Sequence, residues 1–117
     1  MRNCRFIEIE TGTDRIVSYA CGDLDDIESV IVMRTPEYEH LLPRNERGAH
    51  VSCNEDIGAR AFNMVREITV SGRRVRIKGS RRDFDIDCAG VEQEKWDDSL
   101  DLLRLMAADG AFVLDIS

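Results

Sequence analysis

The hydrophobic pattern is most regular between residues 64 and 88, where apolar and polar residues alternate over three short runs. Such alternation is typical of strands with one buried face. Ser71-Gly72-Arg73-Arg74 separates the first two runs, and glycine at the first central position suits a two-residue type II′ hairpin turn. This turn places Val70 opposite Val75 and Ile68 opposite Ile77. A four-residue loop at 79–82 then places Ile77 opposite Phe84 and Val75 opposite Ile86.

The same register pairs charges on the opposite face of these three predicted strands. Cross-strand ion pairs each contribute a few tenths of a kcal/mol to about 1 kcal/mol. Because the apolar and the charge patterns agree, we expect a three-stranded antiparallel meander. The expected pairs are Lys78 with Asp83, Arg76 with Asp85, Arg74 with Asp87 and Glu67 with Lys78.

Further strands are predicted at residues 4–10, 15–21, 28–34, 49–53 and 112–116. Val30-Ile31-Val32-Met33 is a continuous apolar run, which favours a strand that is central or covered on both faces. An acidic loop is expected at 22–26, and the polar excursion at 36–48 is expected to contain one helical turn. Residues 54–63 show no clear pattern.

One helix is predicted at residues 96–109, with Asp97 or Asp98 as its N-terminal cap and Gly110 at its C-terminal cap. The fold class is therefore α+β: a predominantly antiparallel β-sheet of about seven or eight short strands with one C-terminal α-helix packed on one face. Residues 1–117 are expected to form a single compact domain. The apolar stripe of the helix consists of Trp96, Leu100, Leu103 and Ala107, widened by Leu102, Leu105 and Met106.

The net charge and the cysteine spacing indicate which partners and which cellular compartment to expect. The 117 residues carry a net charge of −7, which disfavours nucleic acid and anionic membranes as partners and favours a basic protein. No run of about 20 apolar residues and no secretory signal is visible. The four cysteines are widely separated and contain no C-x-x-C pair, so we expect free thiols in a cytoplasmic, reducing compartment.

Residues 66–82 carry seven basic residues and one acid, a net of +6, but no interleaved aromatics. A single-strand nucleic-acid surface needs both features. We expect the neighbouring aspartates to neutralise most of these cations and to leave Arg73, Arg81 and Arg82 free. Contact with nucleic acid is therefore not expected.

Candidate chemistry is sparse. His40 and His50 are the only histidines, and no nucleophile motif accompanies them. The acidic run from Asp23 resembles a calcium loop, but Glu28 and Arg34 stand where such a loop needs glycine and glutamate. We therefore expect no catalytic residue, no metal, no cofactor and no enzymatic activity.

From residue 28 onward, four features follow one another. They are an apolar strand that ends in Arg34-Thr35 and leads to Glu37 (residues 30–37), a strand that begins with Gly48 (48–51), an alternating hairpin (65–77) and a helix (98–103). This order of features resembles the immunity protein 10 family of bacterial polymorphic toxin systems. The chain departs from the pattern of that family at Asn63-Met64, where a double glycine is usual. The resemblance implies a cytoplasmic antidote that binds and occludes a toxin domain without catalysis.

We therefore predict a partner-binding surface for a basic protein. Two other classes stay open: a self-associating scaffold, such as a homodimer, and a small-molecule or enzymatic module. The last would use the 36–53 loop with His40 and His50 and requires a concave pocket there. The predicted contact residues are the exposed acids Asp23, Asp25, Asp26, Glu37 and Glu39, with Tyr38 as an aromatic anchor.

Overall fold

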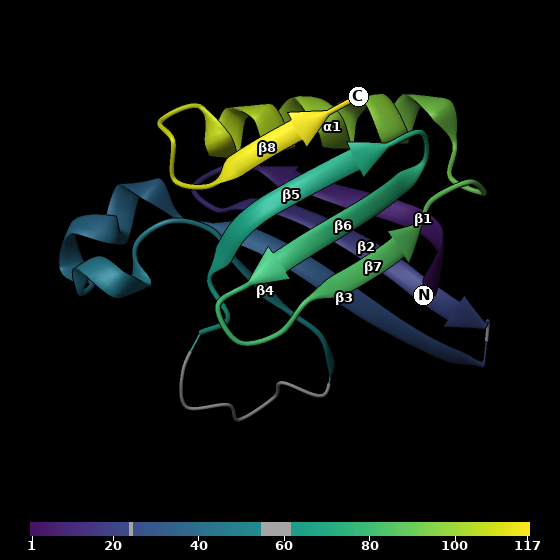
Figure 1. Cartoon of the computed structure of the whole chain (residues 1–117), viewed down its shortest axis with the longest axis horizontal. Helices are drawn as coiled ribbons and strands as arrows, with labels where there is room; N and C mark the ends of the chain where they lie inside the picture. Colours follow the sequence, from purple (N-terminus) through teal and green to yellow (C-terminus); the bar gives the residue numbers. More distant parts are fainter. Residues whose placement is uncertain (24, 55–61) are drawn as a thin grey trace.

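The strands form two four-stranded layers that pack face to face (Figure 1). The computed structural model describes residues 1–23, 25–54 and 62–117. Among these residues, no helix has both the length and the apolar character needed to cross a membrane. The first layer contains β1 (Arg2–Thr11), β2 (Arg15–Asp23), β3 (Asp26–Arg34) and β4 (His50–Ser52). The second layer contains β5 (Val65–Ser71), β6 (Arg74–Gly79), β7 (Phe84–Asp87) and β8 (Val113–Ile116).

The two layers meet at two corners. The strand order β4-β3-β2-β1-β7-β6-β5-β8 is continuous, but β1 and β7 pair in parallel over only two residue pairs, Arg2 with Ile86 and Asn3 with Asp87. At the second corner, His50 of β4 forms an isolated bridge with Met64, just before β5. Because the pairing at both corners involves few residues, the layers separate between the corners. The apolar side chains of both layers then form one core between them.

The helix α1 (Gln93–Ala107) lies across the top of the two layers in Figure 1 and packs on β1, β2 and β8. Trp96, Leu103 and Met106 are buried in the common core. The α+β class, the mainly antiparallel sheet and the C-terminal helix are confirmed. The exceptions to antiparallel pairing are the β1–β7 and β5–β8 pairs.

The predicted meander is confirmed in its register. Val70 lies opposite Val75 and Ile77 lies opposite Phe84, as alternation requires. Gly72 has a φ of 59°, and no described non-glycine residue has a positive φ, which is the combination that a type II′ turn needs.

The outer ion pairs differ in detail from the prediction. Lys78 pairs with Glu67 as expected, at 3.9 Å. Arg74 lies opposite Asp87 in register, but its guanidinium reaches diagonally to Asp85 at 2.5 Å. Long arginine side chains reach such diagonal neighbours easily. Asp83 does not extend the strand; its carboxylate accepts a hydrogen bond from the Gly79 backbone N–H at 3.2 Å.

The helix begins earlier than predicted, so the assignment of Asp97 or Asp98 as its cap was wrong. The cap residue is Glu92, whose carbonyl accepts the Trp96 N–H at 3.0 Å. Asp97 lies inside the helix and accepts a hydrogen bond from Gln93 at 2.9 Å. Leu105 is exposed on the solvent side rather than part of the apolar stripe.

The two connecting segments of the first half contain more regular structure than expected. In the acidic segment, β2 continues to Asp23 and β3 begins at Asp26, and these two aspartates lie opposite each other. The polar excursion contains two short 3-10 helices, η1 (Pro36–Leu41) and η2 (Arg44–Glu46). The segment without a clear pattern, 54–63, lies mostly outside the described residues.

Candidate functional site

The solvent side of the first layer is unusual for this chain because β2, β3 and β4 place no charged residue on it. Strand alternation turns Val17, Val30 and Val32 into the core and the residues between them outward. In a chain that is 33% charged, an antiparallel sheet would normally expose charges on its solvated face. We call this surface the uncharged face; it consists of Ile16, Ser18, Ala20, Gly22, Ile27, Ser29, Ile31, Met33, His50 and Ser52.

The second layer provides an internal comparison. On β6 and β7, the outward residues Arg74, Arg76 and Asp85 form a charge-paired surface. The outer face of β6 and β7 is therefore charged, whereas the outer face of β2, β3 and β4 is not. On the uncharged face Ile27 is 39% exposed, Ile16, Ile31 and Met33 are half-buried, and Ala20 is buried. Apolar area that reaches the surface without charged neighbours is typical of a surface that contacts another molecule.

A depression of about 550 Å³ lies on the uncharged face. Ile16, Ile31 and Met33 contribute its apolar lining. The neighbouring strand β1 supplies two acids, since Glu8 lies opposite Ser18 and Glu10 lies opposite Ile16. Lys95 of α1 also lines it. The surface thus combines an uncharged centre with carboxylates along its β1 side.

His50 closes the β4 end of this surface. Its ring stacks on Phe62, with centroids 4.8 Å apart and an interplanar angle of 17°. Burial lowers the pKa of His50 below its ordinary value, which keeps the imidazole uncharged at neutral pH. His50 therefore adds no charge to the uncharged face at neutral pH.

Behind this face, Arg34 joins three elements. Its guanidinium donates to both carboxylate oxygens of Glu39 at 2.8 and 2.9 Å. It also donates to both oxygens of Asp109 at 2.7 Å and to the Met106 carbonyl at 2.6 Å. The side chain is only 7% exposed, so the cluster fastens η1 and the end of α1 to the end of β3.

The charges of this cluster hold each other in the ionised state. Hydrogen bonds to Glu39 and then Asp109 raise the pKa of Arg34. The hydrogen bond from Arg34 lowers the pKa of Glu39, and the same group lowers the pKa of Asp109 to about 2. The Glu39 carboxylate also accepts the Gly48 N–H at 3.2 Å. The cluster is a structural brace, and it leaves Glu39 only 15% exposed.

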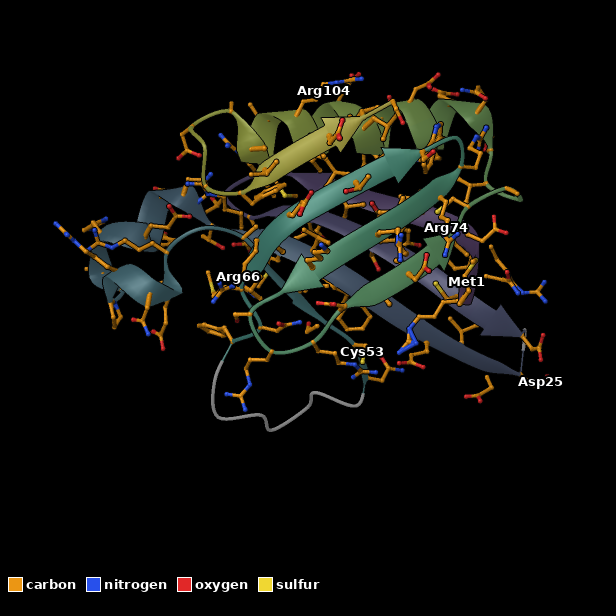
Figure 2. The ribbon with its side chains drawn as sticks, in the orientation of Figure 1. Met1, Asp25, Cys53, Arg66, Arg74 and Arg104 are labelled. Carbon is orange, nitrogen blue, oxygen red and sulfur yellow. The ribbon has the colours of Figure 1, made fainter. Side chains whose placement is uncertain are left out.

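The predicted contact residues lie in two separate places. Asp23, Asp25 and Asp26 are exposed at the β2–β3 turn, where Figure 2 shows Asp25 at the outermost tip. This turn directly follows the Gly22 and Ile27 end of the uncharged face. Arg5 lies beside Asp23 at 3.4 Å, a contact in which the aspartate side chain remains 92% exposed.

The other predicted contacts lie in η1, at the opposite end of β3. Nine residues of strand separate the two groups, which corresponds to roughly 30 Å. Glu37 and Tyr38 are exposed as expected, whereas the expectation that Glu39 is exposed was wrong because Arg34 holds it. Tyr38 and Leu41 are 51% and 71% exposed, and their i, i+3 spacing places them on one side of a 3-10 helix.

The residues considered for other chemistry are dispersed. His40 is exposed in η1, and the depression touches the 36–53 segment only at His50 and Ser52. Across the described ranges, no group of three or more His, Cys, Asp or Glu side chains is placed to hold a metal ion. All four cysteines are buried, and Cys4, Cys21 and Cys88 are free thiols.

Two of the three arginines expected to be free are bonded. Arg73 donates to the carbonyls of Cys88 and Val91 at 3.2 and 2.9 Å and lies 5.0 Å over the Trp96 ring. Arg82 lies 4.9 Å over Phe84 and donates to Cys53 at 3.2 Å. Contacts with aromatic rings and with other groups of the protein therefore hold Arg73 and Arg82, which the charge pattern alone predicts to be free.

The uncharged face and the Arg34 cluster were not recognised from the sequence, although both have a signal there. Alternation places Arg34 on the same side as Val30 and Val32, which marks it as an inward cation. The outward positions of residues 16–20 and 27–33 contain no charge. Strand register was needed to show that these positions are neighbours.

A scan against protein-family models finds no match, and neither curated proteins nor solved structures yield one.

Proposed function

We propose that the protein is a non-catalytic, cytoplasmic protein-binding module that occludes a basic partner through its uncharged face, in the manner of an immunity protein. The observation that carries the proposal is the absence of charge from the outward positions of β2, β3 and β4. Keeping such a surface in water has a free-energy cost, which a partner removes by covering it.

The sign of the partner follows from what surrounds this face. Glu8 and Glu10 lie along its β1 side, and Asp23, Asp25 and Asp26 lie beyond its Ile27 end, so acids outnumber the neighbouring cations Lys95 and Arg5. With a net charge of −7, the chain attracts a basic protein over long range and repels acidic ones. The acids would set the association rate and orientation, while the apolar centre would supply the affinity.

The partner-binding role of Glu37 and Tyr38 remains part of the proposal as a separate contact. The Arg34 cluster fixes η1, so Tyr38 and Leu41 are held in place before any partner arrives. Preorganised apolar anchors lose less conformational entropy on binding than mobile ones.

A matched pair of charge insertions tests the proposal. Ile31→Lys places a cation in the centre of the uncharged face, and Thr69→Lys places one on the outward side of β5, opposite Arg76. Tagged wild-type protein and both variants would be used to capture proteins from the lysate of the host, with quantitative mass spectrometry as the readout. Equal melting temperatures would establish that all three are folded.

We expect wild type and Thr69→Lys to retain the same dominant basic protein, and Ile31→Lys to retain at least about tenfold less. Equal capture by both variants would show that the uncharged face is not the binding surface. If the tagged protein were recovered alone, as an oligomer that the Ile31→Lys variant does not form, the uncharged face would be a self-association surface and not a binding surface for a basic protein.

A further inference from the structure

A second depression, of about 460 Å³, lies at the start of β5 and is separate from the one on the uncharged face. Phe62, Arg66 and Arg81 line it, together with Asn45 and Glu46 of η2. Figure 2 shows Arg66 near the lower end of β5, on the side of the 3-10 helices. The proposed protein-binding surface uses none of these residues.

The two arginines of this depression differ from most others in the chain. Arg34, Arg73 and Arg74 each donate hydrogen bonds to acceptors of the protein. The guanidinium groups of Arg66 and Arg81 have no ion-pair or hydrogen-bond partner within the described part of the chain. They also belong to the segment 66–82, which carries a net charge of +6. Two unpaired cations on one depression favour an anion.

The backbone holds both arginines in place. The β5–β6 register shifts between Val65 and Glu67, so Arg66 is the extra residue of a β-bulge. Bulges redirect a side chain away from the regular alternation, often at functional sites. Arg66 therefore leaves the charge-paired outer face of β5 and β6 and lines the depression.

Arg81 is fixed by the Asn63 side chain. The amide oxygen of Asn63 accepts the N–H groups of Arg81 and Arg82 at 2.9 and 3.1 Å, and its amide nitrogen donates to the Arg82 carbonyl at 2.8 Å. The loop fits so closely that a Cβ at Gly79 would lie 2.2 Å from the Asn63 oxygen. The backbone beneath Arg81 is thus ordered before a ligand binds.

Phe62 adds an aromatic ring to the lining of the same depression. The residue is 46% exposed, although large aromatic side chains are usually buried. His50 supports one face of its ring at 4.8 Å. A partly exposed ring that lines a depression and is supported by a stacked neighbour is suited to stack a planar group, as in nucleotide-binding sites.

We propose that this depression binds a mononucleotide, with its phosphate on Arg66 and Arg81 and its base on Phe62. Arginine matches phosphate geometry with paired N–H donors. The volume of about 460 Å³ lies within the range of small-molecule sites. Glu46 at the same depression can accept a hydrogen bond from the amino group of a base, which favours adenine over uracil.

The charge of the whole protein limits the ligand to a small one. A net charge of −7 repels a polyanion, whereas a single phosphate meets mainly the local +6 segment. The site therefore takes a free nucleotide in preference to an oligonucleotide strand.

Isothermal titration with AMP, adenosine, inorganic phosphate and a short oligoadenylate tests this assignment. The variants are Arg66→Ala, Arg81→Ala and Phe62→Leu. Arg104→Ala is the control, because Arg104 is an exposed arginine on α1 that pairs with Asp101 at 3.0 Å and does not line the depression. Melting temperatures within the range of wild type would establish that each variant is folded.

We expect AMP to bind wild type and Arg104→Ala equally, and each of the other variants to weaken binding about tenfold. Inorganic phosphate should bind more weakly and should respond to the arginine variants but not to Phe62→Leu. Absence of heat with millimolar AMP, or equal weakening by Arg104→Ala, would overturn the site. Oligoadenylate binding about tenfold tighter than AMP would overturn the restriction to a free nucleotide.

Discussion

The Arg34 cluster gives the most quantitative prediction, because one side chain joins three elements. The guanidinium makes five hydrogen bonds and is 7% exposed. Arg34→Met keeps much of the volume but leaves Glu39, which is 15% exposed, without its counter-ion. Removing one partner of a buried ion pair typically destabilises by 3–5 kcal/mol.

The Asp109 half of the cluster contributes less to this total. Its side chain is 60% exposed, so water replaces most of what the guanidinium provides. We therefore expect Arg34→Met to lower the free energy of unfolding by about 3 kcal/mol, the lower end of that range. For a domain whose total stability is on the order of 5–15 kcal/mol, this is a large fraction.

The same cluster predicts how stability depends on pH. The folded-state pKa values of Glu39 and Asp109 are lowered, the latter to about 2. Because unfolded carboxyls titrate near pH 4, the stability from these groups is complete above about pH 5 and is lost as the pH falls through the folded values. Arg34→Met removes the cause of both shifts, so its acid-dependent loss should be shallower than that of wild type.

Urea unfolding followed by the fluorescence of Trp96, the single tryptophan, measures both quantities at neutral pH and at several values down to about pH 3. Arg104→Met is the control, since the Arg104–Asp101 pair is 55% and 75% exposed and should contribute less than about 1 kcal/mol. The reasoning would be refuted if Arg34→Met lowered the free energy of unfolding by less than about 1 kcal/mol. It would also be refuted if the free energies of unfolding of this variant and of wild type decreased in parallel at low pH.

Two further predictions concern the core and a loop. Gly79→Ala should destabilise by about 1–3 kcal/mol in urea unfolding, because the added Cβ would lie 2.2 Å from Asn63; an unchanged midpoint would contradict this. The buried thiols should react with an aromatic disulfide reagent only as fast as the protein unfolds. Contact with Cys21 lowers the pKa of Cys4, but contact with Cys88 and burial raise it to about 12, so rapid labelling of native protein is the contrary result.

The β5–β6–β7 meander was predictable from the sequence because its information is local, whereas the parallel pairing of β8 with β5 joins residues more than 40 positions apart. A two-residue turn at Gly72 fixes the β5–β6 register, and the alternation of residues 68–70 and 74–78 then determines which side chains are buried next to the turn. Each basic residue of β6 also has an acid opposite it on a neighbouring strand. Local turn chemistry, apolar pattern and charge pattern agree there, which is the condition under which sequence specifies structure most clearly.

The first layer was less predictable because its neighbours are distant in sequence. The apolar run at residues 30–33 correctly indicated a central strand, and β2 and β4 flank β3. The run alone did not show that its inward residues join the core and its outward residues form the uncharged face. The partner of Arg34 at Asp109 lies 75 residues away, beyond any local pattern.

The acids illustrate why charge counting alone misplaced one site residue. Glu37 and Glu39 are two positions apart in the same polar segment, yet Glu37 is exposed and Glu39 is 15% exposed. The difference arises because η1 turns Glu39 toward the inward guanidinium of Arg34. Composition gives the number of acids, but only the packing decides which of them a partner can reach.

The stacked pair of His50 and Phe62 determines which variants separate the two proposed sites. His50 lines the depression on the uncharged face, and Phe62 lines the depression at the start of β5. Because the rings support each other at 4.8 Å, Phe62→Leu perturbs both surfaces. Ile31 lines only the first depression and Arg81 only the second. Loss of partner binding in Ile31→Lys with intact AMP binding, and the reverse in Arg81→Ala, is therefore the pattern that two independent sites require, whereas loss of both in either variant points to one shared surface.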